Sequence, residues 1–429
     1  MLKNIIQFKL KILAKIIVAK YKPRIIGITG SVGKTSTKEA VYTVLRDKFN
    51  TRSSIKNYNN EIGLPLTIIG TDSAGKSIIG WFKVFFKALK LILSYDNNYP
   101  RVIILEMGID HPGDMEYLLG IAKPEIGILT FVGSVHAEFF GSKEKLRQEK
   151  SLLIKSVDKN GYSIINYDNE GSRKSISESK AKVISYGLDE KANLRAQEIR
   201  YFFEDMNDSA LQGVNFKIIY NGAATPVLLP NVIGTNVIYA ALASAAVGRA
   251  MDMNMVEISQ ALKKLVSPKG RMNIIKGIKN TIIIDDTYNA EPQSMIAAIS
   301  ILKKIPTKNK RIAVLGDMLE LGKYSEAEHC EIGKNIFKLG IDRLVLVGEI
   351  SVNIERGAIE AGMQKDQIFH FDKSIEAGVF LKNKITSGDL ILVKGSQGMR
   401  MENVVKEIML EPKRAPELLV RQDKEWENK

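Results

Sequence analysis

The chain has 429 residues, of which 45% are hydrophobic and 26% charged, and its formal net charge is +14. This length exceeds what one hydrophobic core can organise and predicts two or three globular domains. A single cysteine, Cys330, excludes a disulfide framework or a thiolate-rich zinc site, and fits a reducing compartment. The positive charge indicates anionic partners, with nucleic acid ranked last because no nucleic-acid module is recognisable.

Residues 1–21 have the periodicity of an amphipathic helix. Lys3, Lys11 and Lys15 fall mostly opposite an apolar arc. The arc contains Leu2, Ile5, Ile6, Leu10, Leu13, Ile16 and Ile17. Interspersed lysines exclude a secretory signal, and no stretch is apolar for long enough to span a membrane. Two expectations stay open: packing on the first domain, or contact with an anionic membrane surface.

The next stretch has the pattern of a phosphate-binding loop. An apolar run at residues 25–28 predicts a buried strand, followed by a turn with Gly30 and Gly33 and a helix over residues 35–45. Such a turn can point backbone N–H groups at a phosphate, and the helix N-terminus adds partial positive charge. The general pattern has glycine where this chain has Ile28. We predict binding of a nucleoside triphosphate.

Four polar residues stand just past predicted strands of this first domain. Lys34 can supply charge to the outer phosphates, and the Thr35 hydroxyl can hold Mg²⁺. Glu106 and His136 follow two later apolar runs. Because ligands collect at the carboxyl ends of parallel strands, these side chains are expected to converge on a magnesium-bound nucleotide.

A second amphipathic segment covers residues 77–93. Lys83, Lys87 and Lys90 share one narrow stripe, and the other positions are largely apolar. The apolar side chains are Trp81, Phe82, Phe85, Phe86, Leu89 and Ile92. A helix with so wide an apolar face is buried, paired or laid in a lipid interface, and both protein packing and membrane contact stay open.

Residues 267–271 (S-P-K-G-R) are the expected hinge between two domains. Beyond them, apolar runs alternate with helical segments, which predicts a separate parallel α/β unit. The four runs are residues 281–284, 311–315, 343–347 and 389–393. The predicted fold is α/β, with a P-loop parallel-sheet ATPase domain and a smaller Rossmann-like C-terminal domain. The predicted boundaries are a basic helix at 1–22, the ATPase domain at 23–266, the second domain at 267–410 and a loosely held polar tail at 411–429.

The ordered set of motifs resembles the Mur ligase family. The first half contains T-G-S-V-G-K-T-S, N-x-N-N-E-I-G-L-P-L-T, I-L-E-M-G and V-H-A-E-F-F-G-S, similar to the central domain of Mur ligases. The second half contains G-R-M-N-I-I, D-D-T-Y-N-A-E-P-Q-S-M, L-G-D-M-L-E-L-G, S-E-x-E-H and I-L-V-K-G-S, similar to the C-terminal domain of the MurF branch. The resemblance covers residues 23–405, with the motifs in the family's order.

The resemblance implies an ATP-dependent amide ligation in the synthesis of peptidoglycan precursors. ATP would phosphorylate the terminal carboxylate of a UDP-MurNAc-tripeptide, and the amine of D-Ala-D-Ala would attack the acyl phosphate. The implied cofactors are ATP and Mg²⁺, and the implied partners are these small molecules rather than nucleic acid. A cytoplasmic monomer is expected, with peripheral contact to the inner face of the membrane through residues 1–21 and 77–93.

Site residues follow from the same resemblance. The implied nucleotide contacts are Gly30, Ser31, Val32, Gly33, Lys34, Thr35, Ser36, Asp286 and Asn289. The implied magnesium ligands are Thr35, Glu106, His136 and, once carbamylated, Lys150. The implied catalytic residues are Lys34, His136, Lys150 and Arg271, with Arg271 reaching the γ-phosphate, and the implied substrate contacts are Asn59, Asn60, Lys394 and Ser396.

The chain also departs from the family pattern. Asn236, Val237 and Ala240 stand where family members carry a His-Asn pair and a further Asn, and Glu291 stands where Asn is common. About twenty residues of basic helix precede the P-loop where MurF proteins have a uridine-binding domain. The expectation is that UDP is gripped differently or that the substrate is not UDP-linked.

Two alternative functions stay open. The first is another amide ligase of the superfamily, of the folylpolyglutamate or cyanophycin type. The second is a non-catalytic ATP-binding scaffold at the membrane, which the joint presence of Lys34, Glu106, His136 and Lys150 disfavours. A MurT-like subunit typically carries four cysteines in an insertion, and this chain has one cysteine.

Overall fold

The structure is a computed structural model that describes residues 2–54, 58–75, 77–133, 140–203, 211–422 and 426. It divides into two compact units. The first comprises Met1–Ile199, Asn215–Leu228 and Asn236–Leu265, and the second comprises Arg200–Val214, Leu229–Thr235 and Val266–Lys429. The domain boundaries given above stay predictions.

A nine-stranded sheet organises the first half of the chain. The strand predicted at residues 25–28 and the two apolar runs that precede Glu106 and His136 are confirmed as strands. Its order is β2-β3-β1-β4-β5-β6-β7-β8-β9, and the pairs from β2 through β7 are parallel. The strands are β1 (Arg24–Thr29), β2 (Thr51–Ser53), β3 (Val102–Glu106), β4 (Ile126–Leu129), β5 (Tyr162–Asn166), β6 (Lys182–Gly187), β7 (Leu194–Phe203), β8 (Leu211–Tyr220) and β9 (Ala223–Pro230). Because β1 lies between β3 and β4, the turn after β1 opens where the strand order changes direction, which is where open α/β sheets bind ligands.

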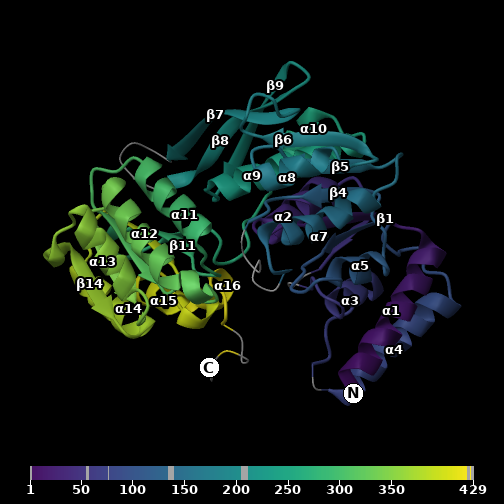
Figure 1. Cartoon of the computed structure of the whole chain (residues 1–429), viewed down its shortest axis with the longest axis horizontal. Coiled ribbons are helices and arrows are strands. Elements are labelled where there is room, and N and C mark those ends of the chain that lie inside the picture. The colour runs from purple at the N-terminus through teal and green to yellow at the C-terminus, as the bar shows by residue number, and fades with distance from the viewer. Residues whose placement is uncertain are drawn as a thin grey trace. The chain divides into compact units, whose positions relative to one another are not determined.

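Helices surround this sheet in the first unit (Figure 1). They are α1 (Leu2–Tyr21), α2 (Lys34–Leu45), α3 (Gly63–Ile69), α4 (Ile78–Leu93), α5 (Asp114–Leu119), α7 (Lys143–Ser156), α8 (Glu170–Arg173), η1 (Lys174–Ile176), α9 (Thr235–Ala250) and α10 (Met255–Leu262). Caps define several of them: the Ser142 hydroxyl accepts from the backbone N–H of Lys145 at the start of α7. No helix in the described part of the chain is long and apolar enough to cross a bilayer.

The buried face of α1 differs from the predicted arc. Leu10, Ala14 and Ile17 are fully buried in the core of the first unit, whereas Ile5 and Ile16 are exposed by 46% and 42%. The helix is apolar on two sides, so its periodicity could not decide which side meets the protein. Packing on the first unit is nevertheless what the structure has.

The second unit is built on a six-stranded sheet of order β10-β11-β15-β12-β13-β14. Only β10 is antiparallel to its neighbour. The strands are β10 (Asn273–Lys276), β11 (Ile282–Asp286), β12 (Arg311–Gly316), β13 (Arg343–Val347), β14 (Ile368–Phe371) and β15 (Leu390–Lys394). The four apolar runs predicted as strands are thus confirmed. The edge strands β10 and β14 were missed because each is four residues long and carries polar side chains.

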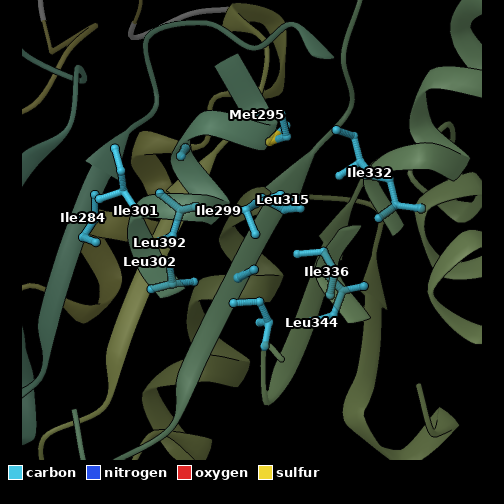
Figure 2. Packing of buried hydrophobic residues seen from close by; sticks show 14 of the residues in the cluster. Ile284, Met295, Ile299, Ile301, Leu302, Leu315, Ile332, Ile336, Leu344 and Leu392 are labelled. Carbon is cyan, nitrogen blue, oxygen red and sulfur yellow. The ribbon is translucent and has the colours of Figure 1, made fainter. Parts of the chain in front are cut away.

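Helices cover both faces of this second sheet. They are η2 (Ile278–Asn280), α11 (Pro292–Lys304), η3 (Gly322–Tyr324), α12 (Ser325–Lys338), α13 (Val352–Ala361), η4 (Lys365–Gln367), α14 (Ser374–Lys384), η5 (Gln397–Met399), α15 (Glu402–Ile408), η6 (Pro412–Arg414) and α16 (Ala415–Leu418). Figure 2 shows Met295 and Ile299 of α11 and Ile332 of α12 meeting Leu315 of β12 and Leu344 of β13 in one buried cluster. A separate cluster on the other face joins the sheet to α14, α15 and α16.

The expectation of a loosely held tail is wrong for residues 411–422. Ala415 and Leu419 are each 1% exposed and belong to the cluster formed by α14 and α15. Two apolar residues four positions apart form one helical turn, which is too short a pattern to stand out in a polar segment.

Candidate functional site

The turn after β1 is held tightly against the segment that follows β4. The backbone N–H of Ser31 donates to the Phe131 carbonyl (2.6 Å), and the Thr130 hydroxyl donates to the Val32 carbonyl (2.7 Å). Gly30 has φ +150°, and a Cβ there would lie 2.0 Å from the Thr130 oxygen. Only glycine therefore fits this position, and the approach fixes the shape of the loop.

Two lysines meet at one carbonyl of this loop. The Lys34 ammonium donates to the Gly30 carbonyl at 2.8 Å, and Lys150 of α7 donates to the same oxygen at 3.3 Å. Gly33 has φ +87° and directly precedes Lys34, the first residue of α2. Lys150 is only 2% exposed although it is a lysine. The predicted phosphate site thus has two cationic side chains at the N-terminus of a helix.

Glu106 is the buried carboxylate of this site. It is 2% exposed, and its Oε1 accepts from the Thr35 hydroxyl (3.3 Å) and the Asn59 amide (3.4 Å). Its Oε2 has no hydrogen-bond partner among the described residues. A buried carboxylate oxygen without a partner is costly, and a divalent cation beside the Thr35 hydroxyl would remove that cost. The residues present fit Mg²⁺ on this ground.

His136, the other predicted imidazole ligand, lies outside the described residues. Within the ranges that the structure describes, no group of three or more His, Cys, Asp or Glu residues is placed to hold a metal. Among the described residues, Glu106 and the Thr35 hydroxyl would hold the cation, and such oxygen donors are typical of Mg²⁺.

The polar loop before α3 lies against Glu106. The Gly108 N–H donates to the Asn59 carbonyl at 2.8 Å, which anchors the loop at the end of β3. The Asn60 side-chain oxygen accepts from the N–H groups of Ile62 (3.3 Å) and Gly63 (3.0 Å). The Asn60 carboxamide therefore organises the start of α3, which the sequence motif did not reveal.

A second group of predicted residues meets within the second unit. Lys394, at the end of β15, forms a 2.7 Å ion pair with Asp286 and donates to the Asn289 carbonyl at 2.8 Å. Asp286 and Lys394 are register partners at the ends of β11 and β15. The Ser396 hydroxyl accepts from the Leu319 N–H at 2.9 Å. The family resemblance singled out these residues one by one, and the contact between Asp286 and Lys394 was not predicted from the sequence.

Arg271 is placed by an aromatic ring. Its guanidinium lies 4.2 Å from the centre of the Tyr288 ring, within the range of a cation–π interaction. The Ser267 hydroxyl donates to the Arg271 carbonyl at 2.5 Å. The Arg271 Nε is buried and has no hydrogen-bond partner among the described residues.

The positions at which the chain departs from the family pattern lie on helix α9 and at the start of α11. Val237 and Ala240 are 4% and 1% exposed on α9, so both belong to the interior of the first unit. Asn236 is exposed. Glu291 is the N-cap residue of α11, and its backbone N–H donates to the Ser294 hydroxyl at 3.2 Å.

Asp285 is a buried acid that sequence reasoning missed. It is fully buried, and its Oδ1 accepts from the Thr287 hydroxyl (2.6 Å) and N–H (3.2 Å), while Oδ2 has no partner among the described residues. Burial is the main cause that raises the pKa of Asp285 to about 6. In the D-D pair, the first carboxylate points into the unit and the second meets Lys394. Strand alternation was the available signal.

A buried ion pair fixes the same loop from the chain's C-terminal segment. Arg421 donates to Glu402 Oε2 at 2.8 Å, to the Tyr288 carbonyl at 3.1 Å and to the Thr287 carbonyl. Glu402 is fully buried, and it also accepts from Arg400 at 2.7 Å. Nothing in the sequence signalled this contact, because Arg421 lies in a polar segment distant along the chain.

Comparison with known proteins agrees with this arrangement. The family model of the Mur ligase middle domain matches residues 28–79 and 86–248. The model of the Mur ligase glutamate ligase domain matches residues 270–397. The two matches follow one another in the order of the two predicted domains.

Individual relatives are similar over most of the chain. The UDP-N-acetylmuramoyl-tripeptide–D-alanyl-D-alanine ligase of Buchnera aphidicola is 31% identical over 90% of this chain and 75% of its own length. The ligase of the same name from Bacillus subtilis is 29% identical over 93% of this chain and 79% of its own. The structure is similar to that of the Thermotoga maritima MurF ligase in complex with ADP, at 25% identity and a TM-score of 0.76, covering 94% of this chain and 83% of that one. The chain belongs to the Mur ligase family, in its MurF branch.

Proposed function

We propose that the chain is an ATP-dependent ligase that adds D-alanyl-D-alanine to a UDP-MurNAc-tripeptide during peptidoglycan precursor synthesis. The relatives named for this activity cover most of the chain and match it through both domains. The observation within the molecule that carries the proposal is Glu106, a buried carboxylate with an unpartnered oxygen beside Thr35 and the phosphate loop.

The residues of the first unit suit the activation step. A carboxylate oxygen of the tripeptide attacks the γ-phosphorus of ATP, ADP leaves, and an acyl phosphate forms. Lys34 and the loop N–H groups neutralise the phosphate charge that otherwise repels the attacking carboxylate. Glu106 and Thr35 would hold Mg²⁺, which would supply positive charge to offset that of the phosphates. His136 stays a predicted third ligand.

Lys150 is proposed to act as a carbamate. Its nitrogen lies 3.3 Å from the Gly30 carbonyl in a buried position. Once deprotonated, this amine would add to CO₂ and release a second proton to solvent, and the resulting carboxylate could hold a second Mg²⁺. An unmodified ammonium at this place would repel a divalent ion.

The second step joins the two substrates. The amine of D-Ala-D-Ala attacks the acyl carbon, the tetrahedral intermediate expels phosphate, and the nitrogen loses a proton. Lys394 contacts Asp286 and Asn289, and the Ser396 hydroxyl donates to the carbonyl of Ala290, the residue after Asn289. We assign these polar residues of the second unit to nucleotide and incoming substrate. Arg271 is assigned to the γ-phosphate.

A substrate-dependence assay tests the proposal. Purified protein with ATP and Mg²⁺ is expected to release phosphate only when UDP-MurNAc-tripeptide and D-Ala-D-Ala are both present. Lys34→Ala removes the charge next to the phosphates and should lower the rate about 100-fold or more. Lys48→Ala is the matched control, because Lys48 lies beyond the other end of α2 in an exposed ion pair with Glu257.

Three results would contradict the proposal. Phosphate release with folate and glutamate in place of the muramoyl substrate favours the folylpolyglutamate alternative. If the protein binds nucleotide without turnover, and if Lys34→Ala leaves its function intact, the non-catalytic scaffold is favoured. Turnover independent of divalent cation removes the assignment of Glu106 and Thr35 to Mg²⁺.

A monomer in the cytoplasm, next to the inner face of the membrane, stays the predicted state and location.

A further inference from the structure

Helices α1 and α4 form a pair on the first unit (Figure 1). The Lys20 ammonium of α1 donates to the carbonyls of Leu91 (2.9 Å) and Ile92 (2.8 Å) at the end of α4. The Tyr21 hydroxyl donates to the Leu91 carbonyl at 3.0 Å. Because the C-terminal ends of both helices meet, the two helices run in the same direction.

Each helix of the pair is fixed to the core by one face. Leu10, Ala14 and Ile17 of α1 recur at helical spacing and are fully buried. Val84, Ala88 and Leu91 of α4 do the same, with at most 6% exposure, in the same cluster. The protein therefore needs no further apolar residues on either helix for packing.

Both helices nevertheless carry a second apolar stripe that faces water. On α4 it recurs every three or four residues and lies on the side opposite Val84, Ala88 and Leu91. The stripe consists of Ile78, Phe82, Phe86, Leu89 and Leu93, exposed by 70%, 70%, 72%, 47% and 83%. On α1 the corresponding stripe consists of Ile5, Phe8, Ile12 and Ile16, exposed by 46%, 64%, 42% and 42%. Two exposed stripes on paired helices mark an interaction surface.

The charge around these stripes has one sign. Helix α1 contains five lysines and α4 contains three, and neither contains an aspartate or glutamate. By helical spacing, exposed Lys9 and Lys15 border the α1 stripe on its two sides. Exposed Lys83, Lys87 and Lys90 border the α4 stripe on one side. A face that is apolar at its centre and basic at its rim complements a surface that is apolar inside and anionic outside.

We propose that α1 and α4 together form a membrane-docking surface that lies in the interface of an anionic bilayer. The phenylalanine and isoleucine stripes enter the boundary between headgroups and acyl chains, and the lysine ammonium groups reach the lipid phosphates. Neither helix is long and apolar enough to cross the bilayer, so the contact is peripheral. A second copy of the chain is a poorer occupant, because it would bring one all-lysine rim against another.

Vesicle sedimentation tests the proposal on the full chain. The protein is expected to sediment with vesicles of phosphatidylglycerol and phosphatidylcholine in equal parts and to stay in solution with phosphatidylcholine alone. Added salt should weaken the binding once the Debye length falls well below about 10 Å. Phe82→Ser with Phe86→Ser should weaken it about tenfold or more, because each side chain loses apolar area that enters the lipid.

Charge and apolar area are tested separately, each against a matched control. Lys83→Glu with Lys90→Glu should also weaken binding about tenfold or more, since each lysine near an anionic surface contributes a factor of about five and both are replaced by a repelling charge. The charge control is Lys365→Glu with Lys373→Glu, and the apolar control is Ile375→Ser with Val379→Ser, all exposed positions of the second unit. Both controls should bind vesicles like the parent protein.

Two outcomes would overturn the proposal. One is a failure of the parent protein to bind anionic vesicles, or binding that is the same in the two α4 double variants, provided that their melting temperatures equal that of the parent protein. The other is a dimer in vesicle-free solution that Phe82→Ser with Phe86→Ser dissociates, which assigns this face to a second copy. Ligase activity measured on soluble substrates is a separate readout, so failure of the membrane proposal leaves the proposed reaction standing.

Discussion

Glu106 is the residue on which the magnesium assignment depends. Glu106→Gln keeps the bonds from Thr35 and Asn59 to the remaining carbonyl oxygen but removes the negative charge. We expect the rate of ATP-dependent ligation to fall about 100-fold and the Mg²⁺ concentration for half-maximal rate to rise. The metal-free protein should melt no lower than the parent, because a buried charge with an unpartnered oxygen is removed.

A control variant separates the effect of losing Glu106 from the effect of losing any carboxylate of the first unit. Glu125→Gln affects a half-exposed acid of the same unit that pairs with Arg24 at the surface. Its Mg²⁺ titration of activity should match that of the parent protein. An unchanged titration in Glu106→Gln as well would contradict the role assigned to Glu106.

Asp285 makes a prediction about pH. Its pKa is raised from 3.8 to about 6 in the folded protein, mainly by burial. Because the folded state favours the protonated carboxyl, Asp285 stabilises the fold fully below the unfolded pKa of 3.8. This stabilisation is lost as pH rises through about 6, and the free energy of unfolding falls by about 3 kcal/mol in total. Asp285→Asn keeps an oxygen for the Thr287 donors and cannot ionise. Denaturant unfolding at pH 4 and pH 7 should show the variant gaining stability relative to the parent as pH rises, and equal pH dependence in both proteins would contradict this.

At the scale of elements, the C-terminal segment stabilises the loop between β11 and α11. Arg421→Ala removes donors to Glu402 and to two carbonyls of that loop, leaving Arg400 as the partner of a fully buried carboxylate. We expect unfolding free energy to fall by about 2–4 kcal/mol. The KM for ATP should rise as well, because Asp286 and Asn289 flank the loosened residues.

Arg414 provides the matched control on the same segment. It forms ion pairs with Glu411 and Glu417, but all three side chains are largely exposed, so Arg414→Ala should leave unfolding and KM unchanged. Equal effects of the two arginine substitutions would show that burial of the Glu402 pair is not what matters.

At the scale of the whole molecule, the chain divides into two compact units, and each contains buried hydrophobic clusters. The cluster around Leu10 and Leu105 belongs to the first unit, and those around Leu315 and Val393 belong to the second. The chain has two tryptophans, Trp81 in the first unit and Trp426 in the second. Trp426→Phe therefore leaves Trp81 as the single fluorescent reporter, in the first unit, and Trp81→Phe leaves Trp426, in the second. We expect the two variants to report unfolding at different denaturant concentrations, and coincident transitions would show that the units unfold as one.

The sequence determined much of this protein because its signals are local. Short apolar runs predict buried strands, and a glycine turn followed by Lys34 and Thr35 predicts a phosphate-binding loop. Polar residues just past the strands of the first domain were expected to converge, since parallel strands end together, and Thr35 does contact Glu106. The ordered motifs gave the family.

Only the tertiary structure decided the rest, because those features join segments that are distant along the chain. The face of α1 that packs on the protein was chosen by α4 and the core, not by the periodicity of α1. Asp285, in sequence half of an acidic pair, became a buried group with a shifted pKa because its strand alternates between inside and outside. Arg421 acquired its role from the Glu402 carboxylate and from carbonyls more than a hundred residues earlier, a contact that no local pattern encodes.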